Sequence, residues 1–188
     1  MTLSTRARSA QQNTSNGTVR MPGCHIALAL VVVAVWGANF VVIDVGLANF
    51  PPLFFSALRF LLAAFPAVLF VGRPQVRWRW VLIVGVVLGI AKFSLLFIGM
   101  KDGMPSGLSS LVLQAQAIFT VAFASVLLGE QPRRAQAIGL GTAICGIVVV
   151  GLDSGSYAPF SAFLLIIGAA VCWGLANVAV RRASPPDM

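Results

Sequence analysis

Charge is scarce in this 188-residue chain: 10% of its residues are charged, with five acids against thirteen lysines and arginines. Soluble domains carry about 25% charged residues, so the composition excludes an ordinary water-soluble globule. The basic residues stand in short clusters between apolar runs, which argues against a nucleic-acid-binding surface despite a net charge of +8. Apolar side chains are abundant instead, at 59% of the chain with a mean hydropathy of +0.93. These values indicate a protein whose partner is the lipid bilayer.

Residues that bind metals or carry acid–base catalysis are also few. His25 is the one histidine and lies at the edge of the first apolar run. Cys24, Cys145 and Cys172 are far apart and match no CxxC or CxxH spacing, which excludes a recognisable zinc site or disulfide framework. The sequence contains no phosphate-binding loop and no Ser/His/Asp spacing. We therefore expect no metal, no cofactor and no enzyme activity.

Six apolar segments reach the roughly 20 residues that a helix needs to cross a bilayer. Turns rich in proline, glycine and charged residues separate them. The sequence thus predicts an all-α membrane protein with helices at residues 26–47, 52–72, 80–100, 107–129, 135–152 and 160–180. Residues 1–23 are polar and basic, which predicts a disordered tail. Translation could start at Met1 or at Met21, directly before the first apolar run.

The distribution of lysine and arginine between the loops predicts the orientation, because positive charge is retained on the cytoplasmic side. With both termini in the cytoplasm, Lys101 is the one cation in the outer loops. The inner loops then hold Arg6, Arg8, Arg20, Arg73, Arg77, Arg79, Arg133, Arg134, Arg181 and Arg182. The remaining cations, Arg59 and Lys92, lie within predicted helices.

A short motif occurs twice. Trp36 to Asn39 (WGAN) has a second copy of its core in Trp173 to Asn177 (WGLAN), with the two tryptophans 137 residues apart. The copies lie on the first and sixth helices and therefore cross the membrane in opposite directions, as in the inverted repeats of many secondary transporters. We expect a first repeat of five helices at 26–152 and the start of a second at 160–188, where the chain stops before the second half continues.

Polar residues on four helices fall at one predicted depth. Counted at about 1.5 Å per residue, Asn39, Arg59, Lys92 and Gln114 lie roughly 10 to 12 Å below the outer surface. A cation at bilayer depth costs about 2.5 to 3.5 kcal/mol on insertion scales, so it needs compensation. Asp44 lies higher, at about 5 Å, and could pair with one of the two cations. The layer would then keep one positive charge for a carboxylate-bearing or zwitterionic substrate.

Structural roles remain open for the same residues. Arg59 could tie helix ends together, Lys92 could extend to the outer interface, and Asn39 could serve as interhelical glue. Trp36 lies near the midplane, which suits either packing or lining a cavity. Gln114 and Gln116 cannot both face one cavity, and the depth count favours Gln114. Two glycines of the third helix, Gly85 and Gly89, form a GxxxG pair that predicts close helix packing.

Three stretches of the chain, VVAVWGANFVVIDVGL, PPLFFSALRFLLAAFPAVLF and GMPSGLSSLVLQAQAIFTVAFASVLLGE, resemble the EamA family of the drug/metabolite transporter superfamily. Within that family they are most similar to the O-acetylserine/cysteine exporters. The resemblance implies two inverted five-helix halves in a bacterial inner membrane. The chain departs from the family at Asp44, where the pattern has lysine, and at Lys92, where those exporters tend to have glutamine.

These observations favour an exporter of small amino-acid-type metabolites that works by alternating access. The expected substrate path is lined by Trp36, Asn39, Asp44, Arg59, Lys92 and Gln114. Two alternatives stay open: a truncated membrane fragment that does not transport, and a half-transporter that forms a homodimer.

Overall fold

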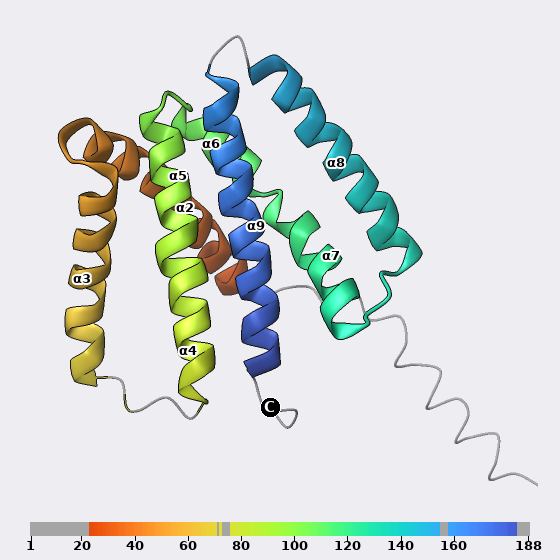
Figure 1. Cartoon of the computed structure of the whole chain (residues 1–188), viewed down its shortest axis with the longest axis horizontal. Coiled ribbons are helices and arrows are strands. Elements are labelled where there is room, and N and C mark those ends of the chain that lie inside the picture. The colour runs from red at the N-terminus through yellow and green to blue at the C-terminus, as the bar shows by residue number, and fades with distance from the viewer. Residues whose placement is uncertain (1–22, 71, 73–75, 155–157, 184–188) are drawn as a thin grey trace, which may run out of the picture. The chain divides into compact units, whose positions relative to one another are not determined.

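The computed structural model describes residues 23–70, 72, 76–154 and 158–183 (Figure 1). All elements in these ranges are helices, and six helical spans are long and apolar enough to cross a membrane. The predicted fold class is therefore confirmed. The predicted tail lies outside the described residues, apart from Gly23, which begins the first span.

The spans agree with the predicted helices to within three residues at each end. The first two are α2 (Gly23–Asn49) and α3 (Pro52–Phe70). The third consists of α4 (Trp78–Val84), the π-helix η1 (Gly85–Ala91) and α5 (Lys92–Lys101), and the fourth of α6 (Ser106–Leu113) and α7 (Gln116–Leu128). The last two are α8 (Arg134–Ser154) and α9 (Phe160–Ala183).

Two of the spans are irregular at mid-membrane. The third widens into η1 directly before Lys92. The fourth is interrupted at Gln114 and Ala115, where the backbone N–H of Gln114 donates to Leu111 O at 3.1 Å and that of Ala115 to Val112 O at 3.0 Å. These bonds connect residues three apart, so the helix tightens locally. Such π and tightened turns often lie at functional sites or hinges.

The chain divides into two compact units, one up to Ala38 and the other from Asn39 onward. Within the second unit, α9 is the central helix and packs against α5 on one side and α7 on the other (Figure 1). Its buried face is rich in small residues, among them Ala162, Ala169, Ala170 and Gly174. The hydrophobic effect does not drive the association of helices within lipid, so their association depends on close van der Waals packing. Small side chains allow this close approach.

Close helix contact occurs at glycines other than the predicted pair. In the described part of the chain, a Cβ added to Gly85 would meet no heavy atom within 4 Å, and one added to Gly89 would meet only Phe60 at 3.9 Å. By contrast, a Cβ on Gly99 would lie 3.0 Å from Ala162 O, at the contact of α5 with α9. The prediction of close helix packing at Gly85 and Gly89 is wrong, because no neighbouring helix backbone comes close to either position.

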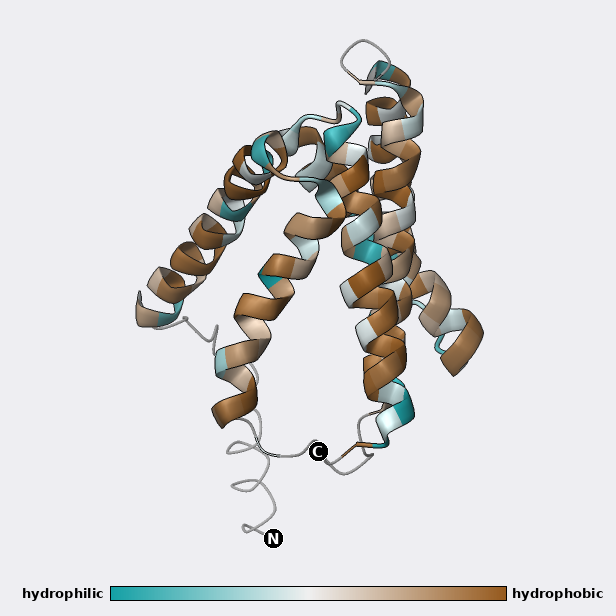
Figure 2. Cartoon of the chain, turned by 60° about the vertical axis from the view of Figure 1, so that its left-hand side comes forward, coloured by the Kyte–Doolittle hydropathy of each residue, from teal (hydrophilic) through white to brown (hydrophobic). Residues whose placement is uncertain are grey.

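Most residues of the spans are hydrophobic, and hydrophilic residues lie at several of their ends and at a few positions within them (Figure 2). None of the α8 residues whose burial is described is buried. Many valine, isoleucine and leucine side chains on α2, α3 and α8 are exposed. Exposure of so much apolar surface is unfavourable in water but favourable in the hydrocarbon core of a bilayer. The arrangement is that of a multi-pass membrane protein.

Candidate substrate site

Asn39 and Arg59 are in direct contact. Arg59 Nη2 on α3 donates a hydrogen bond of 2.9 Å to Asn39 Oδ1 on α2. The two helices are close because Gly46 has no side chain: a Cβ there would lie 2.2 Å from Phe55 Cζ. The short connection between Asn49 and Pro52 thus brings the two helices together locally, and two residues of the predicted polar layer meet between them.

Aromatic rings surround the guanidinium of Arg59. Its Cζ atom lies 6.0 Å from the ring centroid of Phe55, 5.8 Å from that of Phe93 and 5.6 Å from that of Phe97. Each such contact stabilises a cation by about 0.5 to 2 kcal/mol. Nη1 is buried and has no hydrogen-bond partner among the described residues. The rings offset part of the cost of this buried cation but leave one of its donors unsatisfied.

Lys92 is also enclosed by aromatic rings. The side chain is only 6% exposed, and its Nζ lies 3.6 Å from the ring centroid of Phe93 and 4.5 Å from that of Trp173 on α9. Phe93 therefore contacts both intramembrane cations. The widened turn of η1 ends directly before Lys92 and so fixes which side of the span this residue faces. The result is one cluster, which we call the cation cluster. It consists of two cations and four aromatic rings: Arg59, Lys92, Phe55, Phe93, Phe97 and Trp173.

The acid Asp44 does not neutralise this cluster. Its side chain is exposed on α2, and within the described residues the one ion pair is that of Arg181 with Glu130. The pairing of Asp44 with Arg59 or Lys92, considered from the sequence, is not formed. Neither Arg59 nor Lys92 therefore has an anionic partner among the described residues.

A second polar cluster connects α7 with α9. Asn177 Nδ2 lies 2.9 Å from Gln116 Oε1 and 3.0 Å from Thr120 Oγ1, and donates to both. The hydroxyl of Thr120 donates in turn to Gln116 O at 2.7 Å. Trp173, which belongs to the cation cluster, lies one turn before Asn177 on the same face of α9, so the two clusters are adjacent along this helix. The asparagines of both motif copies thus make interhelical hydrogen bonds.

Gln116, rather than Gln114, makes this contact. Gln114 is exposed at the interruption between α6 and α7. The depth count assumed one continuous helix, and the tight turn at Gln114 changes the direction in which the following residues point. The sequence analysis considered Gln116 but preferred Gln114 by its depth. It did not propose Asn177 or Trp173 as site residues, although the second motif copy was the signal that could have identified both. Trp36 belongs to the unit that ends at Ala38.

The ends of α7 and α9 are joined on the side of the arginine-rich loops. Gly129 ends α7 in a left-handed conformation with φ of 70°, which glycine adopts without strain. The next residue, Glu130, accepts two hydrogen bonds from Arg181, at 2.5 and 3.1 Å. Arg182 donates to Leu127 O at 2.9 Å. Glu130 is paired with the sixth span and not with the nearby Arg133 or Arg134 of its own loop.

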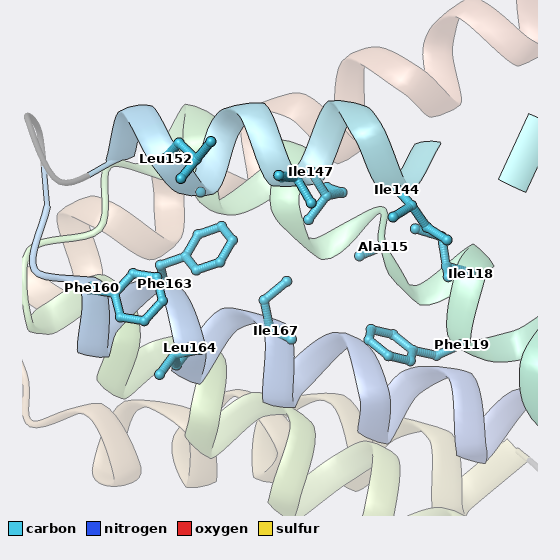
Figure 3. A pocket seen from close by; sticks show the side chains of 12 residues that line it. Ala115, Ile118, Phe119, Ile144, Ile147, Leu152, Phe160, Phe163, Leu164 and Ile167 are labelled. Atoms are coloured by element: carbon cyan, nitrogen blue, oxygen red, sulfur yellow. The ribbon is translucent and has the colours of Figure 1, made fainter. Parts of the chain in front are cut away.

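An apolar cavity of about 530 Å³ lies between α7, α8 and α9 (Figure 3). Phenylalanine and aliphatic side chains point into it, with Phe160 and Phe163 at one end and Ile118 and Phe119 at the other. It contains none of the residues of the cation cluster. Its lining offers no group that would bind a charged metabolite, so we assign the candidate site to the polar clusters.

Comparison with known proteins shows which proteins this chain is related to. Residues 24–152 match the EamA-like transporter family. A probable amino-acid metabolite efflux pump of Salmonella typhimurium is 47% identical over 153 residues, covering 80% of this chain and 51% of the relative. The uncharacterized inner membrane transporter YedA of Escherichia coli is 29% identical over 164 residues, covering 81% and 51%.

A probable terminal-alkyne amino-acid exporter of Streptantibioticus cattleyicolor is 28% identical over 160 residues, covering 82% of this chain and 54% of the relative. No solved structure matches. The chain spans about half the length of the curated relatives that it matches. With its six spans, it is a multi-pass protein of the bacterial inner membrane. The chain belongs to the EamA-like transporter family.

Proposed function

We propose that this protein exports small amino-acid-type metabolites across the inner membrane, with cysteine and O-acetylserine as the first candidates to test. The observation that carries the proposal is the cation cluster: Arg59 and Lys92 come from different spans, contact the same ring of Phe93, and have no anionic partner among the described residues. Charged side chains within membrane spans commonly mark substrate pathways. The printed names of the relatives, an amino-acid metabolite efflux pump and an amino-acid exporter, support the same reading.

In this proposal the substrate carboxylate binds to Arg59 and Lys92. A guanidinium offers a planar pair of donors that matches a carboxylate, whereas an ammonium acts as a point charge. Asn39 holds Arg59 through its hydrogen bond. Asn177, one turn beyond Trp173 on α9, and its hydrogen-bond partner Gln116 on α7 supply amide groups. The roles of Trp36, Asp44 and Gln114 as path residues rest on the sequence alone.

Alternating access would use the contact between α7 and α9. Interhelical hydrogen bonds such as those of Asn177 contribute about 0.6 kcal/mol each in membranes. A half-exposed ion pair such as Arg181 with Glu130 contributes about 0.2 to 1 kcal/mol. The contact can therefore separate at a modest cost in free energy. We propose that its separation opens the site toward the arginine-rich side, which is the cytoplasmic side if the loop charges set the orientation.

Transport by reconstituted vesicles tests the assignment. Vesicles loaded with radiolabelled cysteine or O-acetylserine should lose the label through the protein, and Arg59→Ala should abolish the loss while the protein still inserts. Arg134→Ala, at the exposed start of α8, removes the same charge outside the cluster and should leave transport unchanged. Unchanged transport by Arg59→Ala would contradict the site.

The number of chains in the transporting unit is part of the proposal, because this chain spans half the length of its relatives. Light scattering of the purified protein in detergent, corrected for bound detergent, distinguishes a monomer from a homodimer. A transporting monomer would contradict the half-transporter alternative.

A further inference from the structure

We infer that the transported substrate carries a net negative charge: it has a carboxylate that is not balanced by an ammonium group on the same molecule. This inference rests on the proposed export of amino-acid-type metabolites. Within that class it favours acidic amino acids over cysteine and O-acetylserine, which are zwitterions without net charge near neutral pH. It follows from the composition of the cation cluster, in which Arg59 and Lys92 contact the same ring of Phe93 and neither forms an ion pair with an acid of the described residues.

The whole chain has five acids, so their positions can be checked one by one. Asp44 is exposed on α2, Asp102 lies in the turn after α5, and Asp153 is exposed at the end of α8. Glu130 is bound to Arg181. Asp187 lies outside the described residues. No acid in the described part of the chain therefore compensates Arg59 or Lys92.

The groups that do surround the two cations are neutral. Arg59 has the amide of Asn39 and three phenylalanine rings, and Lys92 has Phe93 and Trp173. Aromatic faces and amide oxygens stabilise a cation but leave its charge in place. In a bilayer interior this charge is weakly screened, so the strongest stabilisation comes from an anion. The unpartnered Nη1 of Arg59 is a donor that a carboxylate oxygen would satisfy.

A zwitterionic substrate fits this cluster less well than an anionic one. It would bring its own ammonium group close to two like charges and would leave the total charge of the site unchanged. The rings of Phe93 and Trp173, which could hold that ammonium, already face Lys92. A net-negative substrate lowers the total charge and meets no such repulsion. The geometry therefore favours acidic amino acids and their derivatives.

Two pairs of amino acids separate the effect of substrate charge on binding from that of substrate size. They are aspartate with asparagine and glutamate with glutamine, since each acid and its amide are of nearly equal size. With the purified 188-residue protein in nanodiscs, we expect calorimetry to show acids binding at least about tenfold more tightly than their amides, equal to 1.4 kcal/mol. Lys92→Gln should reduce this ratio to about threefold or less. Arg134→Gln, which removes an exposed cation, should preserve it.

A second measurement uses the unaltered protein and so does not depend on the folding of variants. In vesicles, an inside-negative potential should accelerate the efflux of aspartate by several-fold and leave that of asparagine unchanged. Equal or tighter binding of the amides, together with their efflux, would overturn this inference and leave the proposed function standing. Failure to bind or move any of the four amino acids, cysteine or O-acetylserine would overturn the proposed function itself.

Discussion

Gly174 on α9 lies against Phe119 on α7 so closely that a Cβ on the glycine would stand 2.7 Å from Phe119 Cβ and 2.9 Å from the backbone nitrogen of Thr120. The backbone on the other side cannot move aside as a flexible side-chain end could. Gly174 belongs to the second copy of the WGAN motif, and its position next to Asn177 allows the hydrogen bonds between α7 and α9 to form.

Gly174→Ala should destabilise the protein by about 1 to 3 kcal/mol, because overpacking forces the helices apart. The measurement is thermal or denaturant unfolding in detergent. Gly139→Ala is the matched control, since a Cβ on Gly139 meets no heavy atom within 4 Å in the described part of the chain. Alanine favours a helix over glycine, so the control should be unchanged or more stable. Equal behaviour of the two variants would contradict the close contact.

The ion pair of Arg181 with Glu130 should couple α7 to α9 weakly. A double-mutant cycle with Arg181→Ala and Glu130→Ala should give an interaction energy of about 0.2 to 1 kcal/mol, because both side chains are about half exposed. The energy should fall in 1 M salt, where the screening length is about 3 Å. A cycle of Glu130 with Arg79 on α4 is the control and should give no coupling. Absence of coupling for Arg181 at low salt would refute the pair.

Trp173 should stabilise the ammonium of Lys92 through the face of its ring. Trp173→Leu removes the aromatic face, whereas Trp173→Phe retains one, so we expect the leucine variant to be less stable by about 0.5 to 2 kcal/mol. Both variants lose the indole nitrogen, which makes their comparison specific for the face. In a Lys92→Met background the difference should disappear. Its persistence there would mean that Trp173 acts by packing alone.

The orientation predicted from the loop arginines can be tested by labelling. In a cysteine-free background, Asp102→Cys in the turn after α5 should react with a membrane-impermeant maleimide on intact cells. Gln131→Cys, between α7 and α8, should react only after the membrane is opened. The opposite pattern would place the arginine-rich loops outside and reverse the proposed direction in which the contact of α7 with α9 opens.

Much of the fold could be predicted from the sequence because bilayer-spanning helices are specified locally. Each span satisfies its own backbone hydrogen bonds and shows itself by length and hydropathy, so six spans were predicted with bounds close to those observed. The motif repeat and the loop charges are likewise visible without coordinates. The contact of Asn39 with Arg59 was also within reach of sequence analysis, because it lies between neighbouring helices joined by a short turn.

Which residues meet in the candidate site depends on how each helix is rotated about its own axis, and the hydropathy of the sequence does not determine this rotation. The widening at η1 fixes the side on which Lys92 meets Phe93 and Trp173, and the interruption at Gln114 leaves that residue exposed while Gln116 reaches Asn177. A shift of one residue turns a side chain by about 100° around a helix. The sequence by itself therefore determined a six-span protein of the EamA-like family with two cations in its spans. Tertiary structure alone decided that Asp44 leaves those cations unpaired, because only packing between distant helices determines which polar groups meet.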